Sequence, residues 1–531
     1  MPGLIRRRWD IVVLAAIVVA GGWLRFAQLD LMEFGGDHLH THVLAVKAAS
    51  GQLPLTGIQS SVGIHNPAMT VYLFSIPALF TKDPVLFGWL PAGLGTAAIA
   101  LGYLLARRWV SKGAALLGML LFAVSPWAIV ESRKIWAPDL PPFLAVAFIL
   151  CVVGWLREGR PGYVIGAMVM LAMLNQIHYS TAPLWAIVVL AAQQGYRKGL
   201  WKAYAGGGAV YLAMWTPFIV FLALGGYREF GQAQLGPGVE RSFLQNISES
   251  GLWLARLADH GGLANSFKLP KDAFAGAGDG VWLTALFGVL AACGAAAALA
   301  RMRRQADLWV IVLWLALPGV VLSFHAVHCH YFIACYPAVF ILIGIAADTA
   351  WEAIVKRGAL QWAAGIAIGV ASCAVVAVAA VEVNFYRRFL EVIASGGGAE
   401  WARGAVYREK LKVAQYLARE AGGGRFVIVE LAHHPSERSY EYLYELAGGE
   451  GEVLKRDEGL SEGLPVYLIY GPGRKGDIDT AEAKLAATGY RRVSAKEDVL
   501  TVERWEARTD RAADSPSRKA AAAKPTQTDP N

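Results

Sequence analysis

Long apolar runs recur along most of the chain and are separated by short polar or basic connections. A run of about 18 or more apolar residues is long enough to cross a bilayer as a helix. The pattern predicts an α-helical polytopic membrane protein with about eleven transmembrane helices. Two of them, at 162–177 and 180–194, are short, so either could be tilted or re-entrant. The expected helices cover 9–27, 84–105, 113–130, 139–156, 162–177, 180–194, 203–224, 281–300, 308–324, 330–349 and 360–382.

The distribution of basic residues favours one orientation. If Arg6, Arg7 and Arg8 lie in the cytoplasm, every even-numbered connection is cytoplasmic, and each of these connections is basic. Cytoplasmic loops of membrane proteins are enriched in Lys and Arg. The odd number of helices then places the C-terminal region outside. The basic connections hold Arg107, Arg108 and Lys112; Arg157 and Arg160; Arg197, Lys198 and Lys202; Arg301, Arg303 and Arg304; and Lys356 and Arg357.

The N-terminus allows a second interpretation. A basic start followed by an apolar run is also typical of a signal peptide. No clear small-x-small cleavage site precedes Trp23 and Arg25, so an uncleaved first helix is expected.

Two loops on the predicted outer side of the membrane are long, namely 28–83 and 225–280. The first contains the apolar piece PAMTVYLFSIPALF, which is too short to span comfortably and is expected to form an interfacial or re-entrant helix. With these loops, residues 1–382 form the expected transmembrane domain.

The character of the sequence changes over residues 405–508. FVIVE (426–430) and VYLIY (466–470) are typical of buried strands, TAEAKLAATGY of a helix, and VLTVERWEA of a final strand. These elements predict a small α/β domain outside the membrane. The polar, Ala- and Pro-biased tail at 509–531 is expected to be disordered.

Composition supports this picture. Hydrophobic residues make up 56% of the chain and charged residues only 17%, whereas soluble domains carry roughly 25% charge. The net charge of +8 does not indicate nucleic-acid binding, because Lys and Arg punctuate the apolar runs and form no single patch. The five cysteines show no CxxC spacing and are interpreted as small buried hydrophobes.

The first outer loop carries the segment FGGDHLHTH just past the first helix. Charged groups near membrane depth are costly and therefore informative. Asp37 could be a catalytic carboxylate with His38, His40 and His42 nearby. It could equally be a helix-capping acid in a solvated loop, because Asp is common at helix N-termini.

The second outer loop, SPWAIVESRKIWAPDLPPF, places Glu131, Arg133, Lys134 and Asp139 between two membrane helices. A cationic cluster at this depth suits an anionic group such as a lipid phosphate. The alternative is structural: Arg133 and Lys134 would anchor the chain at the interface, and Asp139 would cap the following helix.

A third cluster, FHAVHCHYFIACYP, holds His325, His328 and His330 between two predicted helices. Together with Asp37 and the histidines of the first loop, it could bind a divalent metal ion. No compact ligand spacing is present, so histidines that hydrogen-bond at a polar entrance are the favoured interpretation. His65 and His178 also fall on the predicted outer side and extend this polar vestibule.

At these residues the chain resembles membrane glycosyltransferases of the GT-C type. The similarity is strongest to the branch of protein mannosyltransferases and of aminoarabinose and galacturonic-acid transferases, the glycosyltransferase family 39-like enzymes. It covers residues 1 to about 350, and the order of the segments carries it. These segments are GGDHLHTHVLAVKAASGQLP, HNPAMTVYLFSIPALF, PVLFGWLPAGLGTAAIALGYLLARRW, SPWAIVESRKIWAPD and HYFIACYPAVFIL.

The chain departs from the family pattern at two positions. The family commonly has a second acid where His38 stands, and often an Arg where His330 precedes Tyr331. The first departure leaves open the role of a second acid, or of a metal bound by it.

The resemblance implies transfer of a sugar, with inversion, from a polyprenyl-phosphate donor to a lipid or protein acceptor at the outer face of the cytoplasmic membrane. It implies Asp37 as the base that deprotonates the acceptor hydroxyl, and Asp139 as a catalytic residue that orients the acceptor or a cation. The donor phosphate would be bound by Arg133, Lys134, His330 and Tyr331. His38, Glu131 and His328 would be accessory residues, and no cofactor is implied with certainty.

Other functions remain open at this point. A polytopic transporter would also have many helices and few charges within the membrane. A flippase or ligase of lipid-linked glycans would share the lipid carrier. The polar residues lie in outer loops and not in the middle of helices, which favours the transferase.

Overall fold

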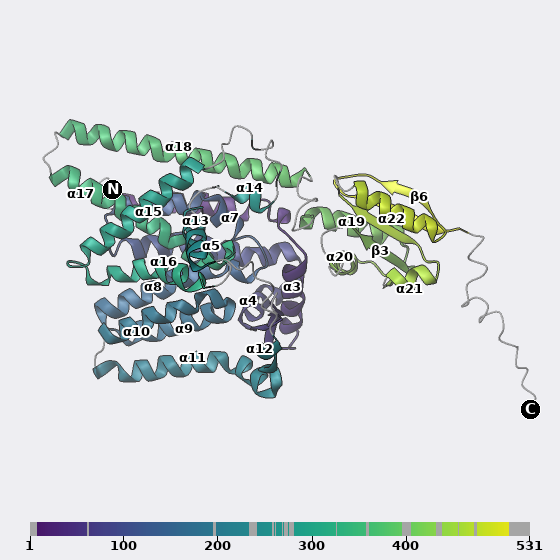
Figure 1. Cartoon of the computed structure of the whole chain (residues 1–531), viewed down its shortest axis with the longest axis horizontal. Helices are drawn as coiled ribbons and strands as arrows, with labels where there is room; N and C mark the ends of the chain where they lie inside the picture. The colour runs from purple at the N-terminus through teal and green to yellow at the C-terminus, as the bar shows by residue number, and fades with distance from the viewer. Residues whose placement is uncertain are drawn as a thin grey trace, which may run out of the picture. The chain divides into compact units, whose positions relative to one another are not determined.

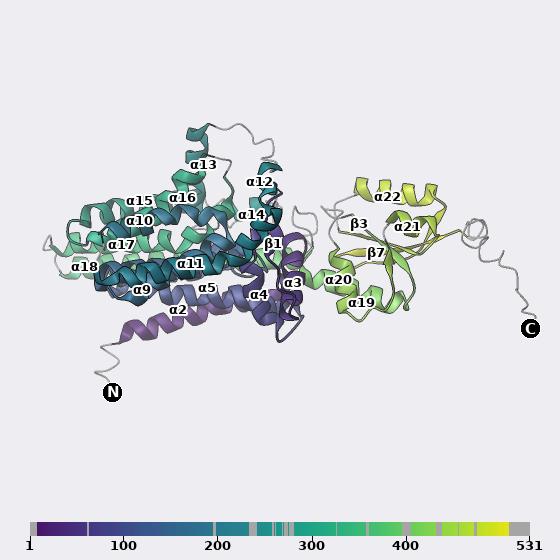
Figure 2. The same cartoon turned by 90° about the horizontal axis from the view of Figure 1, so that it is seen from below.

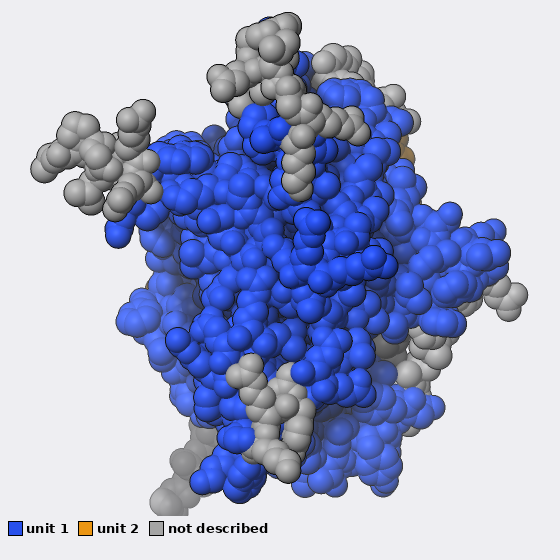
Figure 3. Space-filling view, turned by 90° about the vertical axis from the view of Figure 1, so that its left-hand side faces the viewer, with its two compact units in different colours: residues 1–29, 37–264, 274–388 blue, residues 30–36, 265–273, 389–531 orange. Residues whose placement is uncertain are grey.

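The computed structural model describes residues 8–60, 63–194, 198–232, 242–256, 260, 262–267, 269, 274, 281–324, 327–356, 361–395, 405–431, 438–454, 456–471 and 475–508. The chain divides into two compact units. Unit 1 comprises residues 1–29, 37–264 and 274–388, blue in Figure 3, and unit 2 comprises residues 30–36, 265–273 and 389–531.

Unit 1 is a bundle whose long helices run side by side (Figures 1 and 2). Its apolar side chains pack between neighbours, with α2 against α5 and α6, α8 against α9, and α15 against α17. A short antiparallel hairpin, β1 (Thr56–Gln59) and β2 (His65–Pro67), lies in the first long loop. The helices are α2 (Trp9–Phe26), α3 (Gly36–Ala49), α4 (Met69–Ala78), α5 (Pro84–Ala106), α6 (Lys112–Val124), α7 (Pro126–Val130), α8 (Pro141–Glu158), α9 (Pro161–Ile177), α10 (Trp185–Gln194), α11 (Trp201–Phe221), α12 (Arg228–Gln232), α13 (Phe243–Arg256), α14 (Leu263–Ser266), α15 (Val281–Arg301), α16 (Trp309–Leu322), α17 (Tyr336–Lys356) and α18 (Gln361–Ala394).

A helix is present at each of the eleven predicted spans. Within the described residues, seven helices are long and apolar enough to cross a membrane, which confirms a multi-pass membrane protein. The helices α6, α9 and α16 are apolar but shorter. The total of eleven membrane crossings therefore stays a prediction.

Three predicted helix boundaries were wrong for identifiable reasons. The run 113–130 breaks at Ser125, which is extended because it precedes Pro126. The helix predicted at 330–349 begins at Tyr336, after a 3₁₀ segment at Cys329–Cys335. Helix α18 continues twelve residues beyond 382, because its polar C-terminal part ends the apolar pattern without ending the helix.

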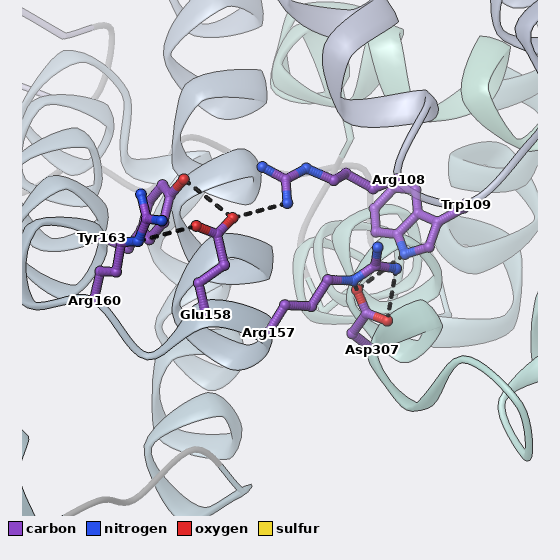
Figure 4. Close-up of polar contacts among 7 residues, drawn as sticks. All are labelled: Arg108, Trp109, Arg157, Glu158, Arg160, Tyr163 and Asp307. Atoms are coloured by element: carbon purple, nitrogen blue, oxygen red, sulfur yellow. Dashed lines mark hydrogen bonds and ion pairs between the residues drawn. The ribbon is translucent and has the colours of Figure 1, made fainter.

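Polar side chains at one end of unit 1 connect three of the basic loops (Figure 4). Arg108, just after α5, donates to Glu158 at the end of α8 at 2.9 Å. Arg157 Nε and Nη2 donate to Asp307 at 2.8 and 3.1 Å, and Trp109 Nε1 donates to the same carboxylate at 3.1 Å. The first, second and fourth basic connections therefore lie at the same end of the bundle, as alternate connections between spanning helices must.

The N-terminal end of α2 carries a further ion pair. Asp10 accepts from Lys112 at 2.7 Å and from the Tyr103 hydroxyl at 2.6 Å. Arg301 at the end of α15 donates to Asp348 of α17 at 3.0 Å. Basic residues that the sequence assigns to topology are thus also paired with carboxylates that bind one helix end to another.

Unit 2 contains a five-stranded sheet in the order β4–β3–β5–β7–β6. The strand β3 is parallel to β4 and β5, whereas β7 is antiparallel to β5 and β6. The elements are α19 (Tyr407–Glu420), β3 (Phe426–Glu430), α20 (Ser439–Leu446), β4 (Val453–Leu454), α21 (Arg456–Ser461), β5 (Val466–Tyr470), α22 (Lys475–Ala487), β6 (Tyr490–Lys496) and β7 (Thr501–Ala507).

The side chains of the sheet alternate between two apolar cores. Phe426 and Tyr467 pack with α19 and α20 on one face, and Val427 and Leu468 pack with α22 on the other. Unit 2 is therefore a layered α/β domain, as the strand pattern predicted. Its limits stay a prediction, since this unit also includes residues 30–36 and 265–273. The tail at 509–531 lies outside the described residues.

Candidate functional site

Asp37 lies in the first turn of α3, and its side chain is exposed. A carboxylate in this position is stabilised by the N-terminal end of the helix dipole. Its Oδ2 atom accepts a hydrogen bond of 3.3 Å from Trp136 Nε1. Because Asp37 follows the C-terminal end of α2 and Asp10 is near its N-terminus, the two acids stand at opposite ends of an 18-residue helix, about 27 Å long.

The loop after α7 is built around Asp139. Its Oδ2 atom accepts the backbone N–H groups of Arg133 and Lys134 at 3.2 and 2.9 Å. The Lys134 ammonium lies 2.5 Å from Glu131 and 3.9 Å from the other oxygen of Asp139. All four charged side chains are buried, at 1–4% exposure. The four residues that the sequence analysis grouped together form a buried network in the structure and not an open cationic surface.

Arg133 binds carbonyl groups at the end of α2. Its guanidinium donates to Leu24 O at 3.0 Å and to Gln28 O at 2.6 Å, and it also donates to the Tyr386 hydroxyl of α18. The last carbonyls of a helix lack partners within the helix. These contacts favour a structural role for Arg133. Its predicted contact with a donor phosphate stays a prediction.

Arg25 plays a parallel part at the end of α6. It is fully buried and donates to the carbonyls of Gly21 and Ala123, each at 2.9 Å. Its guanidinium also lies 5.5 Å from the centre of the Phe122 ring. A charged residue inside an apolar helix is costly, so Arg25 could have been predicted to have a buried partner. The sequence analysis mentioned it only in relation to a cleavage site.

Trp136 is the residue that connects the predicted clusters. Besides its hydrogen bond to Asp37, its ring centre lies 6.3 Å from that of His38 and 5.3 Å from that of His330. The Lys134 ammonium lies 4.4 Å from the same ring. The indole is half-buried. The sequence analysis missed Trp136, although it stands between two residues that were singled out.

The histidines before α17 continue this group. The rings of His328 and His330 are stacked with centres 5.6 Å apart, and Tyr331 packs edge-on against His330 at 4.6 Å. His178, at the end of α9, meets His330 at 5.6 Å. Asp37, Trp136, His330 and His178 come from four predicted outer connections, and the structure brings them together. His325 lies outside the described residues.

The other histidines have separate surroundings. Burial lowers the pKa of His42 to about 4, although a hydrogen bond with the Lys82 backbone opposes this shift, so the imidazole is neutral at pH 7. His65 meets Glu229 of α12 at 2.7 Å, an ion-pair partner that the sequence did not indicate. Burial raises the pKa of Glu229, but its two hydrogen bonds and its charge interaction with His65 together lower that pKa by more.

A metal ion finds no evident site in the part of the chain that the structure describes. No three His, Cys, Asp or Glu side chains there are arranged to hold one. The arrangement instead offers an exposed carboxylate next to half-buried imidazole, indole and phenol rings. Such a surface can accept a proton and can present hydrogen-bonding side chains to a sugar or a phosphate.

Comparison with known proteins identifies the fold. No protein-family model and no curated protein matches the chain. The apo structure of ArnT from Cupriavidus metallidurans aligns with a TM-score of 0.55 at 17% identity and covers 93% of this chain and 97% of ArnT. ArnT bound to undecaprenyl phosphate aligns with a TM-score of 0.53 at 15% identity over 93% of this chain and 98% of ArnT. The chain is thus similar to ArnT over nearly the whole of both proteins, and it has the GT-C fold that its sequence predicted.

Proposed function

We propose that this protein is a glycosyltransferase that moves a sugar from a polyprenyl-phosphate donor to a hydroxyl group of a lipid or protein acceptor. The observation that carries the proposal is the exposed Asp37 carboxylate, held by Trp136 beside His38 and His330. The fold supports it, since ArnT, a protein with this fold, has been observed with undecaprenyl phosphate bound.

The chemistry follows from the residues. Asp37 accepts the proton of the acceptor hydroxyl while the oxygen attacks the anomeric carbon, and the bond from that carbon to the lipid phosphate breaks on the opposite side. A single displacement inverts the anomeric configuration. Positioned bases of this kind typically contribute about 10²–10⁴-fold to the rate.

The leaving lipid phosphate needs hydrogen-bond donors and positive charge. His330 and Tyr331 are half-buried and can reach a ligand, whereas His328 is exposed at the rim. Arg133 and Lys134 are buried in the loop network, so we assign them to shaping this surface. Asp139 and Glu131 hold that loop and act through it.

The reaction is proposed to take place at the outer face of the cytoplasmic membrane. The ion-paired basic connections and Asp37 are at opposite ends of the bundle, since Asp10 and Asp37 flank α2. Basic connections favour the cytoplasmic side. The alternative functions, transport and glycan flipping or ligation, draw no specific support from these contacts.

The proposal is tested by comparing cells with and without the gene. Mass spectrometry of lipid-linked and surface glycans should show one sugar missing from an acceptor in the deletion strain, with the matching polyprenyl-phosphate sugar accumulating. The wild-type gene should restore the product. Unchanged glycans together with an altered uptake or export of a solute would instead favour the transporter.

A further inference from the structure

Trp136 contacts four of the candidate residues. It reaches Asp37, His38, Lys134 and His330 from one half-buried ring. Two parts of the indole act on these neighbours, namely the N–H group and the π-face.

The N–H group faces the carboxylate. Indole Nε1 is a donor only and cannot take a proton from Asp37. A hydrogen bond to an ionised acceptor is stronger than one between neutral groups, although this contact of 3.3 Å is slightly longer than the usual range of about 2.7–3.2 Å. Trp136 therefore limits the positions that the exposed Asp37 side chain occupies.

The π-face is turned towards a cation. An ammonium 4.4 Å from the ring centre is well within the range of cation–π attraction. Lys134 is also paired with Glu131, and its backbone is held by Asp139. One face of the indole thereby lies against the buried, ion-paired Lys134 network, which supports the ring beside Asp37.

We infer that Trp136 is a positioning residue, which holds Asp37 in place through its N–H group and joins it to the Lys134 network through its ring. The inference rests on the proposed function only in one respect, which is the use of the positioned Asp37 carboxylate as a base. The positioning itself can be measured without any substrate.

The experiment uses the full-length protein in lipid nanodiscs at a fixed pH. A water-soluble carbodiimide and an amine label exposed carboxyl groups, and mass spectrometry of the peptides gives the labelling rate of Asp37. Replacing Trp136 by 3-benzothienylalanine removes the N–H group and keeps the shape of the ring, and Trp136→Phe is the simpler form of the same change. Loss of a modest charge-assisted hydrogen bond should raise the labelling rate of Asp37 about threefold to tenfold.

Two controls match this change. Trp185 is also half-buried and donates at 3.3 Å, to the Tyr211 hydroxyl, so Trp185→Phe should leave Asp37 labelling unaltered. Asp83, an exposed acid at the start of α5, reports any general change in reagent access. An Asp37 rate that stays within about 1.5-fold of wild type in the benzothienylalanine variant would overturn the inference.

Binding of undecaprenyl phosphate to the protein in the same nanodiscs tests whether the ring contacts with Lys134 and His330 matter for the site. Trp136→Phe keeps an aromatic face and should bind the lipid within about twofold of wild type. Trp136→Leu loses the contacts with Lys134 and His330 and should bind about fivefold more weakly. Equal binding by the Phe and Leu variants would contradict the role of the ring.

The labelling outcome is separate from the fate of the proposed function, whereas the lipid-binding comparison applies only if the wild-type protein binds undecaprenyl phosphate. An Asp37 that labels faster without the N–H group supports positioning, whatever its substrate. Turnover of Asp37→Asn alone decides whether that acid is the base.

Discussion

Asp307 offers the sharpest test of how the helix ends are joined. It is 8% exposed and lies just before α16. Its carboxylate accepts two bonds from Arg157, at the end of α8, and one from Trp109, in the loop after α5 (Figure 4). Asp307→Ala removes all three bonds and leaves a guanidinium and an indole N–H without their acceptor.

The size of the effect follows from burial. A hydrogen bond to a charged group contributes about 1.5–3 kcal/mol net, and removing one partner of a fully buried ion pair costs about 3–5 kcal/mol. Arg157 is 31% exposed, so water can solvate part of its charge after the substitution. We therefore expect the free energy of unfolding to fall by about 2–3 kcal/mol.

The assay is thermal unfolding of the purified protein in one detergent at one scan rate. A loss of this size should lower the Tm by about 2–3 °C for a protein of this length. Arg160→Ala is the matched control from the same cluster. Arg160 pairs with Glu158 at 3.3 Å but is 74% exposed, so its removal should leave the Tm almost unaltered. Equal Tm values for Asp307→Ala and wild type would refute the view that this end of the bundle is held by the Asp307 contacts.

Three further predictions concern the site, pH and topology. Arg133→Gln should lower the Tm, because the carbonyl groups at the end of α2 lose their donor. His330→Ala should keep the Tm of wild type and weaken the binding of undecaprenyl phosphate. Weaker lipid binding by Arg133→Gln at an unaltered Tm would instead assign phosphate binding to Arg133. The neutral His42 has a pKa of about 4 in the folded state and about 6.5 when unfolded, so its contribution to stability is complete above pH 6.5 and falls by about 1.4 kcal/mol per pH unit as the pH drops towards 4. Denaturant titrations should show that the free energy of unfolding of His42→Leu falls less steeply with pH in this window than that of wild type. An equal dependence on pH in both proteins would refute the assignment of a neutral, buried His42. Reporter fusions after Arg304 and after Glu409 should report opposite sides of the membrane, and the same side for both would overturn the orientation.

The sequence could predict the elements whose signal is local. Apolar runs located a helix at each of the eleven positions, and the short segments FVIVE, VYLIY and VLTVERWEA located β3, β5 and β7. Residues in adjacent outer loops were expected to meet, because alternate connections of spanning helices share a side. Asp37, His330 and His178 do meet, through Trp136 and the histidine rings.

The remainder depended on contacts between residues far apart in the chain. The sheet order β4–β3–β5–β7–β6 is set by pairing between distant strands, which no local pattern specifies. Tyr386 reaches Arg133 only because α18 continues beyond its apolar part. The burial of Lys134 against Glu131 likewise could not be predicted, because the local sequence does not show which distant helices cover this loop.

Asp37→Asn tests the central claim most directly. Asn keeps the size and much of the hydrogen-bonding shape of Asp but cannot serve as a base, and loss of the charge in the first turn of α3 should cost only about 0.3–1 kcal/mol. Turnover and melting are measured on the same purified sample, with the donor that the glycan comparison identifies. The account predicts a Tm close to that of wild type and a loss of turnover of at least about 100-fold, the lower end of the contribution of a general base. Turnover within about threefold of wild type, well below that contribution, would contradict it and remove Asp37 from the mechanism.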